Sequence, residues 1–89
     1  MAMTYEQSSS YGQHMRNGDW HMNKAAEYER QHYYSDAKSH YYGAMVEYGK
    51  AYDIAHAAND YAENSALSNY RSAESSFRSM GQKSYDYYK

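Results

Sequence analysis

The chain has 89 residues, no cysteine, no proline and a formal net charge of −2 at pH 7. A chain of this size forms one domain at most, and without cysteine it has neither a disulfide framework nor a thiolate metal site. The charge gives no electrostatic reason to expect nucleic acid or a membrane as the main partner, and no apolar run approaches the roughly 18 residues of a spanning helix. We therefore expect a soluble, cytoplasmic protein.

Tyrosine takes the place of the missing large aliphatic side chains. The chain has fourteen tyrosines, whereas leucine, valine, isoleucine and phenylalanine occur once each. A shortage of aliphatic residues is typical of disorder, but disordered chains also carry a high net charge. A tyrosine ring buries a large area, provided that its hydroxyl finds a partner or water. The composition thus predicts a folded domain with a thin core lined by tyrosine and alanine.

The N-terminal segment, residues 1–18, is expected to form either a short helix or a frayed arm. Thr4 and Gln7 have the spacing of a capping box, which favours a helix start. Three consecutive serines and a glycine follow, and these residues are indifferent or poor helix formers. The pair Asn17-Gly18 predicts a stop.

The next helix is predicted at about residues 20–31, with Asp19 as its N-cap. The apolar phase shifts between Gln31 and Tyr33, because extending the following stripe backwards meets only polar residues. We therefore predict a turn at Gln31 to Tyr33 rather than one unbroken helix.

The most regular pattern in the chain predicts a long helix at about residues 34–57. Aromatic and small residues alternate there at steps of three and four, the spacing of one helix face; they are Tyr34, Ala37, Tyr41, Ala44, Tyr48, Ala51, Ala55 and Ala58. A second apolar row lies beside the first and consists of Tyr42, Met45, Gly49 and Tyr52. Because glycine is unfavourable inside a helix, Gly43 and Gly49 indicate that another backbone or side chain comes close.

A last helix is predicted at about residues 60–80, followed by a tyrosine-rich tail. Asp60 is its expected N-cap and Gly81 its C-cap. The predicted fold is all-α, a small antiparallel bundle of three helices with one long central helix; a helix near the N-terminus would make four. The predicted organisation is an N-terminal arm or short helix at 1–18, a helical domain at 19–81 and a tail at 82–89.

The spacing of small and aromatic residues is similar to that of two helical families. One stretch resembles a single helical hairpin of a tetratricopeptide repeat in its spacing; the residues that match are Ala25, Tyr28, Tyr34, Ala37, Tyr41 and Ala44. The long helix and its successor also look like the three-helix microtubule-interacting-and-trafficking domain. His32 stands where the repeat usually has a turn glycine, and no second repeat follows. The resemblance implies a helical hairpin architecture and, as a function, protein binding.

The best candidates for metal ligands are His32, Asp36 and His40, which follow Glu29 at helical spacing. Imidazole and carboxylate groups on one face could hold a divalent transition metal. However, the predicted turn removes Glu29 and His32 from that face, and a straight helix separates side chains eight residues apart by about 12 Å. We therefore expect a solvated polar face there, with no metal and no cofactor.

Catalysis and nucleic-acid binding have little support in the sequence. No nucleophile elbow, phosphate-binding glycine loop or Walker-type lysine is present, so we expect no enzyme. Arg71, Arg78 and Lys83, with the tail tyrosines, could contact nucleic acid. Glu74 and Asp86 interrupt this basic row, so a nucleic-acid-associated accessory protein is the alternative function.

The tyrosine and methionine content instead predicts a non-enzymatic protein-binding module. Such residues are enriched at interfaces, where tyrosine supplies contact area at low entropic cost. The expected partner-binding residues are Trp20, Met22, Tyr33, Tyr42, Tyr52, Tyr85, Tyr87 and Tyr88. The module would act as an inhibitor or adaptor by occupying a surface of a larger protein. Phages and mobile elements encode proteins of this size and kind, and self-association into a homodimer is a related outcome.

Overall fold

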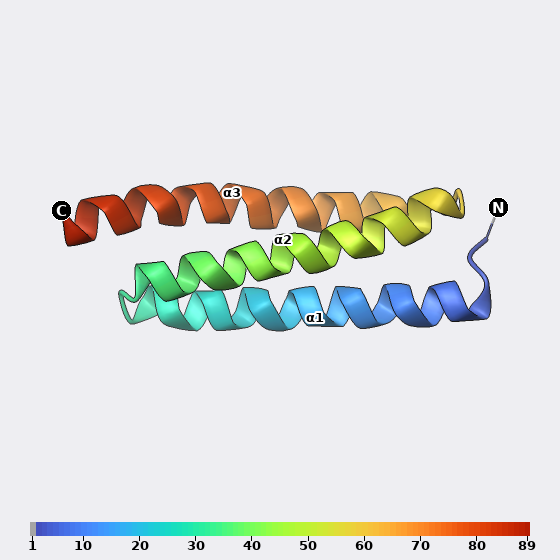
Figure 1. Cartoon of the computed structure of the whole chain (residues 1–89), viewed down its shortest axis with the longest axis horizontal. Coiled ribbons are helices and arrows are strands. Elements are labelled where there is room, and N and C mark those ends of the chain that lie inside the picture. The colour runs from blue at the N-terminus through green and yellow to red at the C-terminus, as the bar shows by residue number, and fades with distance from the viewer. Residues whose placement is uncertain (1) are drawn as a thin grey trace.

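Three long helices make up almost all of the chain. The computed structural model describes residues 2–89 and contains α1 (Tyr5–Arg30), α2 (Tyr34–Ala57) and α3 (Ala62–Tyr88), as Figure 1 shows. No strand is present among residues 2–89. The prediction of an all-α chain is confirmed, and the three helices leave no separate fourth helix at the N-terminus.

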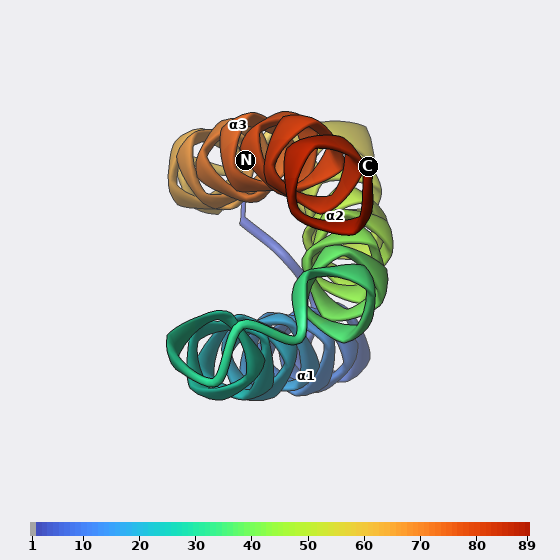
Figure 2. The same cartoon turned by 90° about the vertical axis from the view of Figure 1, so that its left-hand side faces the viewer.

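The helices form an open, curved layer in which α2 is the middle member. The chain reverses direction at each turn, so α2 runs against both of its neighbours (Figure 1). The end-on view in Figure 2 shows α1 and α3 on the same side of α2, with α2 as the back of the curve. α2 packs along both α1 and α3, whereas contact between α1 and α3 is slight. The molecule is elongated, with extents of 49 × 16 × 13 Å.

α1 is one continuous helix, which corrects the predicted stop at Asn17-Gly18 and the predicted start near residue 20. The helix begins at the predicted capping box. The Gln7 amide donates to Thr4 Oγ1, and the Thr4 amide donates to Gln7 Oε1. Gly18 is buried inside the helix, and a Cβ atom there would lie 2.4 Å from the nearest atom of the Tyr48 ring. The glycine therefore makes room for a neighbouring helix instead of ending its own.

Both turns are tight and end their helices in the same way. At the first, predicted at residues 31–33, the Tyr33 amide donates to the Tyr28 carbonyl and His32 has a positive φ of 64°. At the second, the Asp60 amide donates to the Ala55 carbonyl, and Asn59 has a φ of 58°. These are the bonds and the left-handed residue of a Schellman motif, in which glycine is the usual residue.

α3 runs to Tyr88, so the predicted end near residue 80 and the predicted tail at 82–89 are wrong. Gly81 does not cap the helix and has a negative φ. Asp60 Oδ1 accepts from the amide of Ala62, the first residue of α3, but the N-cap position is held by Tyr61, so the predicted N-cap at Asp60 is one residue too early. Further along, Lys83 Nζ lies 2.9 Å from Glu29 Oε2 on α1. This ion pair and the contacts of Tyr87 with His32 and Tyr34 attach the last two turns of α3 to the rest of the fold.

The core is narrow because small residues meet along the helix contacts. Buried small residues recur every seven positions within each helix; they are Gly18 and Ala25, then Ala37, Ala44, Ala51 and Ala58, then Ala66 and Ala73. A seven-residue repeat is the period at which two helices keep the same faces together over their length. Tyr41 and Tyr48 are 6% and 3% exposed, so their rings fill the core between α1 and α3. The predicted aromatic and alanine stripe of α2 is thus the buried face of the molecule.

Candidate aromatic binding surface

The residues expected to bind a partner differ in how much of each side chain reaches solvent. Six are more than half exposed, namely Trp20, Tyr33, Tyr42, Tyr85, Tyr87 and Tyr88. Tyr52 is half-buried. Met22 is also half-buried and packs against both core clusters, so its role is structural. The structure divides the exposed aromatic residues among three surfaces.

The first surface is a groove between α2 and α3 with Gly49 at its floor. Two adjoining hollows, of about 290 and 310 Å³, share Gly49, Asp53 and Tyr70. We call this the Gly49 groove; its walls are Tyr42, Met45, Val46, Lys50, Tyr52, Asp53, Leu67 and Tyr70. All four members of the second apolar row predicted on α2 therefore lie in one groove. α3 supplies the opposite wall.

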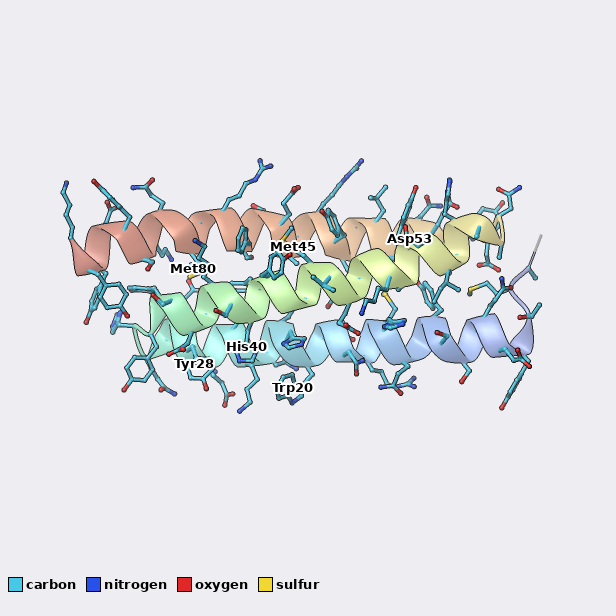
Figure 3. All side chains as sticks on the ribbon, in the orientation of Figure 1. Trp20, Tyr28, His40, Met45, Asp53 and Met80 are labelled. Carbon is cyan, nitrogen blue, oxygen red and sulfur yellow. The ribbon has the colours of Figure 1, made fainter. Side chains whose placement is uncertain are left out.

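Aromatic and charged groups border the Gly49 groove. Tyr42 is 55% exposed, and its ring centroid lies 5.7 Å from that of Phe77 on α3. Lys38 Nζ lies 5.4 Å from the centre of the Phe77 ring, within the range of a cation–π contact. Asp53 is exposed at the other end of the groove, and Figure 3 labels it near the contact of α2 with α3. Lys50 and Asp53 lie in the walls, so the groove carries charged groups of both signs beside its apolar residues.

The second surface lies over the contact of α1 with α2 and centres on Trp20. The Trp20 ring meets the edges of two histidine rings, His21 at 5.0 Å and His40 at 5.6 Å between centroids. Tyr28 stacks on His40, with centroids 5.5 Å apart and an interplanar angle of 14°. Figure 3 shows Trp20, Tyr28 and His40 close together on these two helices. Tyr33 extends the series through its contact with Tyr28.

Within this surface, His21 and His40 meet through their Nδ1 atoms, which are 3.0 Å apart. Gly43 lies beneath His21, and a Cβ atom there would come within 2.9 Å of the imidazole. The glycine predicted to allow a close approach therefore admits a histidine side chain. Burial, followed by the neighbouring His40, lowers the pKa of His21 below its ordinary value of 6.5, and the more distant Glu47 opposes this shift.

The third surface is at the C-terminal end of α3 and folds back on the first turn. The Tyr87 ring lies parallel to the His32 ring, with centroids 6.1 Å apart, and meets Tyr34 edge-on at 5.2 Å. Tyr88 in turn contacts Tyr87. Tyr85 contacts Lys89, whose Nζ lies 5.7 Å from the centre of the ring. The two contacts of Tyr87 with His32 and Tyr34 therefore hold the end of α3 to the rest of the fold.

Two buried tyrosines present their hydroxyl groups to carboxylates of α1. Tyr48 donates to Asp19 at 2.6 Å, and Tyr41 donates to Glu29 at 2.9 Å. Burial, then the bond to Glu29, raises the pKa of Tyr41 to about 12. Burial and Asp19 raise the pKa of Tyr48 in the same direction. Both phenols stay protonated at neutral pH, so these contacts bind helix to helix and supply no nucleophile.

The residues named as metal-ligand candidates are not brought together. His32 lies in the first turn with its Nδ1 atom 2.7 Å from the Tyr34 hydroxyl, whereas His40 faces His21. Asp36 is exposed on α2. In residues 2–89, no three histidine, cysteine, aspartate or glutamate side chains are grouped closely enough to hold a metal ion.

The basic residues of α3 are largely engaged with acidic or aromatic neighbours. Arg78 lies 3.4 Å from Glu74, and Lys83 is paired with Glu29. Arg71 is exposed beside a serine-rich stretch of the same helix. The structure therefore places no continuous row of unpaired basic side chains along this part of α3.

The sequence alone did not find Leu67 and Tyr70 as walls of the Gly49 groove, nor the pairing of His21 with His40. Both depend on which residues of two helices come level with each other, and this register is set by the packing of the whole chain. For His21 and His40 the only signal was Gly43 inside a helix, where a Cβ atom would come within 2.9 Å of His21; at Gly49 it would make only ordinary contact, 3.7 Å from Tyr70.

Comparison with known protein families, with curated proteins and with solved structures finds no match. Among residues 2–89, none of the helices combines the length and the apolar character needed to cross a membrane. The functional argument therefore rests on the three surfaces themselves.

Proposed function

We propose that this chain is a non-enzymatic protein-binding module whose Gly49 groove receives apolar side chains of a larger protein. The supporting observation is that an exposed tyrosine, Tyr42, and the half-buried side chains of Met45, Tyr52 and Tyr70 border a groove at Gly49. Tyrosine, methionine and tryptophan are enriched in the centres of protein interfaces, and hot-spot side chains sit in well-packed pockets. By occupying a surface of its partner, the module would act as an inhibitor or adaptor.

The groove suits a partner that presents an apolar side chain from a helix or a turn. Each hollow has the volume of a small-molecule pocket at its lower limit, about 300 Å³, which is enough for one or two large side chains. A contact through Tyr42 and Tyr52 requires little ordering, because each side chain has few rotatable bonds. Lys38 and Asp53 near its two ends could fix the direction in which the partner lies.

The decisive variant fills the groove from within. A Cβ atom at Gly49 would make ordinary contacts, 3.7 Å from the Tyr70 ring, so Gly49→Met places its side chain in the groove without a backbone clash. Gly12→Met is the matched control, since Gly12 is also inside a helix but its closest neighbour is the flexible end of Arg16. Tyr42→Ala and the control Tyr61→Ala form a second pair, because Tyr61 is 91% exposed and lies outside the groove.

The experiment is affinity capture from the native host with all four variants, read by quantitative mass spectrometry. We expect one stoichiometric protein partner that Gly49→Met and Tyr42→Ala each reduce by at least about tenfold, as for a hot-spot residue. The two controls should retain it. Equal retention by all four variants would exclude the groove. Steeply salt-dependent capture of DNA or RNA instead would favour the nucleic-acid alternative.

A further inference from the structure

The contact between His21 and His40 is unusual because two basic side chains face each other across a helix interface. Their Nδ1 atoms are 3.0 Å apart, which is hydrogen-bonding distance. The ring centroids are 5.2 Å apart, so the two Nδ1 atoms lie close to the line that joins the rings. One Nδ1 must therefore carry a hydrogen and the other must accept it. We call these two residues the histidine pair.

The surroundings of the histidine pair hold both rings in place. Gly43 leaves room for the ring of His21 but for little else. Tyr28 stacks on the face of His40, and Trp20 covers the edges of both rings. Neither ring can turn away without breaking an aromatic contact. The distance between the two nitrogens is consequently fixed by the packing of α1 against α2.

The number of protons on the pair decides whether this contact attracts or repels. With both rings neutral, one Nδ1–H donates to the other Nδ1. With one ring charged, the same bond becomes charge-assisted and shorter. With both rings charged, two N–H groups point at each other and no acceptor remains, so the contact repels. The hydrogen bond between the two Nδ1 atoms is therefore kept when one of the two rings is charged and is lost when both are charged.

The charged groups around the pair do not cancel this repulsion. On α1, Lys24 adds positive charge over the Trp20 ring, and Glu27 lies 3.5 Å from that lysine. On α2, Glu47 attracts protons toward the pair but is already bonded to His14 and Asn17. Asp36, one turn before His40, is exposed, so water screens its charge. No group of α3 contributes to the lowered pKa of His21.

We propose that the histidine pair is a proton-sensitive joint between α1 and α2, which holds with no proton or one proton and loosens when both rings are charged. Uptake of the second proton by the pair is coupled to separation of the two helices around Gly43. This inference is independent of the proposed binding role.

The sign of the effect follows from the direction of the shift. In the folded state His21 binds its proton at a pH below 6.5, whereas in the unfolded chain it does so at its ordinary pKa. The unfolded state therefore holds more protons in this interval, and stability falls as the pH is lowered below 6.5. The aspartates and glutamates, with ordinary pKa values near 4, stay ionised over the upper part of that range.

The test begins with the unaltered protein. A titration of the imidazole nitrogens by NMR, from pH 8 to pH 5, should show two separate steps for the pair, the second below 6.5. Trp20 is the only tryptophan, so its fluorescence should change with the second step and report the joint directly. If both rings become charged together near pH 6.5, with no change at Trp20, the proposal is wrong.

Two matched variants separate the pair from the other histidines. His40→Gln can still hydrogen-bond to His21 but cannot be charged, so its unfolding equilibrium should respond to acid less than that of the parent. The expected difference is about tenfold for each unit by which His40, as distinct from burial, lowers the pKa of His21. His32→Gln removes an exposed histidine of the first turn, whose Nδ1 atom faces the Tyr34 hydroxyl away from the pair, and it should keep the acid response of the parent. Identical acid responses in the parent and His40→Gln would overturn the proposal.

Discussion

Glycine has two different roles in α1, and the neighbouring helix decides which. At Gly12 a Cβ atom would meet only the flexible end of the Arg16 side chain, at 3.2 Å. At Gly18 it would lie 2.4 to 2.8 Å from three atoms of the Tyr48 ring. That ring is buried and its hydroxyl is bonded to Asp19, so it has little freedom to move aside. The same residue type is thus a weak point of the helix at one site and a requirement of the packing at the other.

This contrast predicts opposite effects of the same substitution. Gly12→Ala should stabilise the protein by up to about 1 kcal/mol, because alanine is the better helix former. Gly18→Ala gains the same propensity but overpacks the core, so we expect a net loss of about 1 to 3 kcal/mol. Unfolding by urea, followed by circular dichroism, measures both values. A stabilising Gly18→Ala would show that the Tyr48 ring does not rest on this glycine.

The buried tyrosine hydroxyls predict a loss of stability at alkaline pH. The pKa of Tyr41 is raised to about 12 in the folded state, from an ordinary value of 10. Stability from this group is complete below pH 10 and is lost as the pH rises toward 12, because the unfolded chain releases the proton first. Tyr48 and Tyr11 shift in the same direction.

Ultraviolet absorbance of tyrosinate during a titration checks this expectation. A late fraction of the absorbance change, above pH 10, should appear together with unfolding, as the raised pKa of Tyr41 requires. Tyr41→Phe should reduce that late fraction and flatten the fall of stability above pH 10. A single step near pH 10 with the helices intact would contradict the buried hydrogen bonds.

At the scale of the helix, the last two turns of α3 are held by contacts with the rest of the fold. Tyr87 packs against His32 and Tyr34, whereas Tyr85, two residues earlier, contacts only the side chain of Lys89 among the aromatic and cation–π pairs described. Lys83 reaches Glu29 across the open side of the layer. A segment that reads as a free tail in the sequence is therefore part of the structure.

Two alanine substitutions should distinguish a docked helix end from a free one. Tyr87→Ala should destabilise the protein by about 1 kcal/mol, because it removes two aromatic contacts between helices. Tyr85→Ala should change stability by less than about 0.5 kcal/mol, as is usual for an exposed position. Urea unfolding, with amide exchange of residues 82–88 as a local readout, measures the difference. Equal values would mean that the end of α3 is not docked.

At the scale of the whole molecule, three long helices lying side by side make a chain that is longer and thinner than a compact domain of the same mass. The radius of gyration over Cα atoms is 14.3 Å, whereas a compact chain of this length has a value of about 12 Å. The reason is the length of the helices, 24 to 27 residues each, which gives the molecule a long axis of 49 Å against 16 and 13 Å across. α1 and α3 both pack on α2 and make only slight contact with each other. Polar links join them at intervals, such as the Tyr11 hydroxyl donating to the Ala62 carbonyl.

Small-angle X-ray scattering tests this shape directly. A monomer with three full-length helices should give a radius of gyration at or slightly above 14.3 Å, the excess coming from side chains and the hydration shell. A chain folded into a rounder, compact domain would give a value near 12 Å. Light scattering on the same sample gives the mass, so that a dimer, which would also raise the radius, is recognised.

The candidate surfaces could be predicted only in part. Tyr42, Met45, Gly49 and Tyr52 share a face of α2 at helical spacing, so the sequence places them together. Their partners on α3 depend on the register between two helices that local spacing does not specify. The tail tyrosines were expected either to fold back or to form a contact surface, and Tyr87 folds back.

The long central helix, its apolar stripe, the two turns and the cap at Thr4 could be predicted, because each depends on residues within a few positions of one another. The continuation of α1 through Gly18, the continuation of α3 through Gly81 and the contact of His21 with His40 depend instead on how the three helices pack. A glycine is unfavourable in an isolated helix, and its cost is offset only when another helix supplies contacts at that place. Those contacts come from residues distant in the chain, so no local pattern contains them.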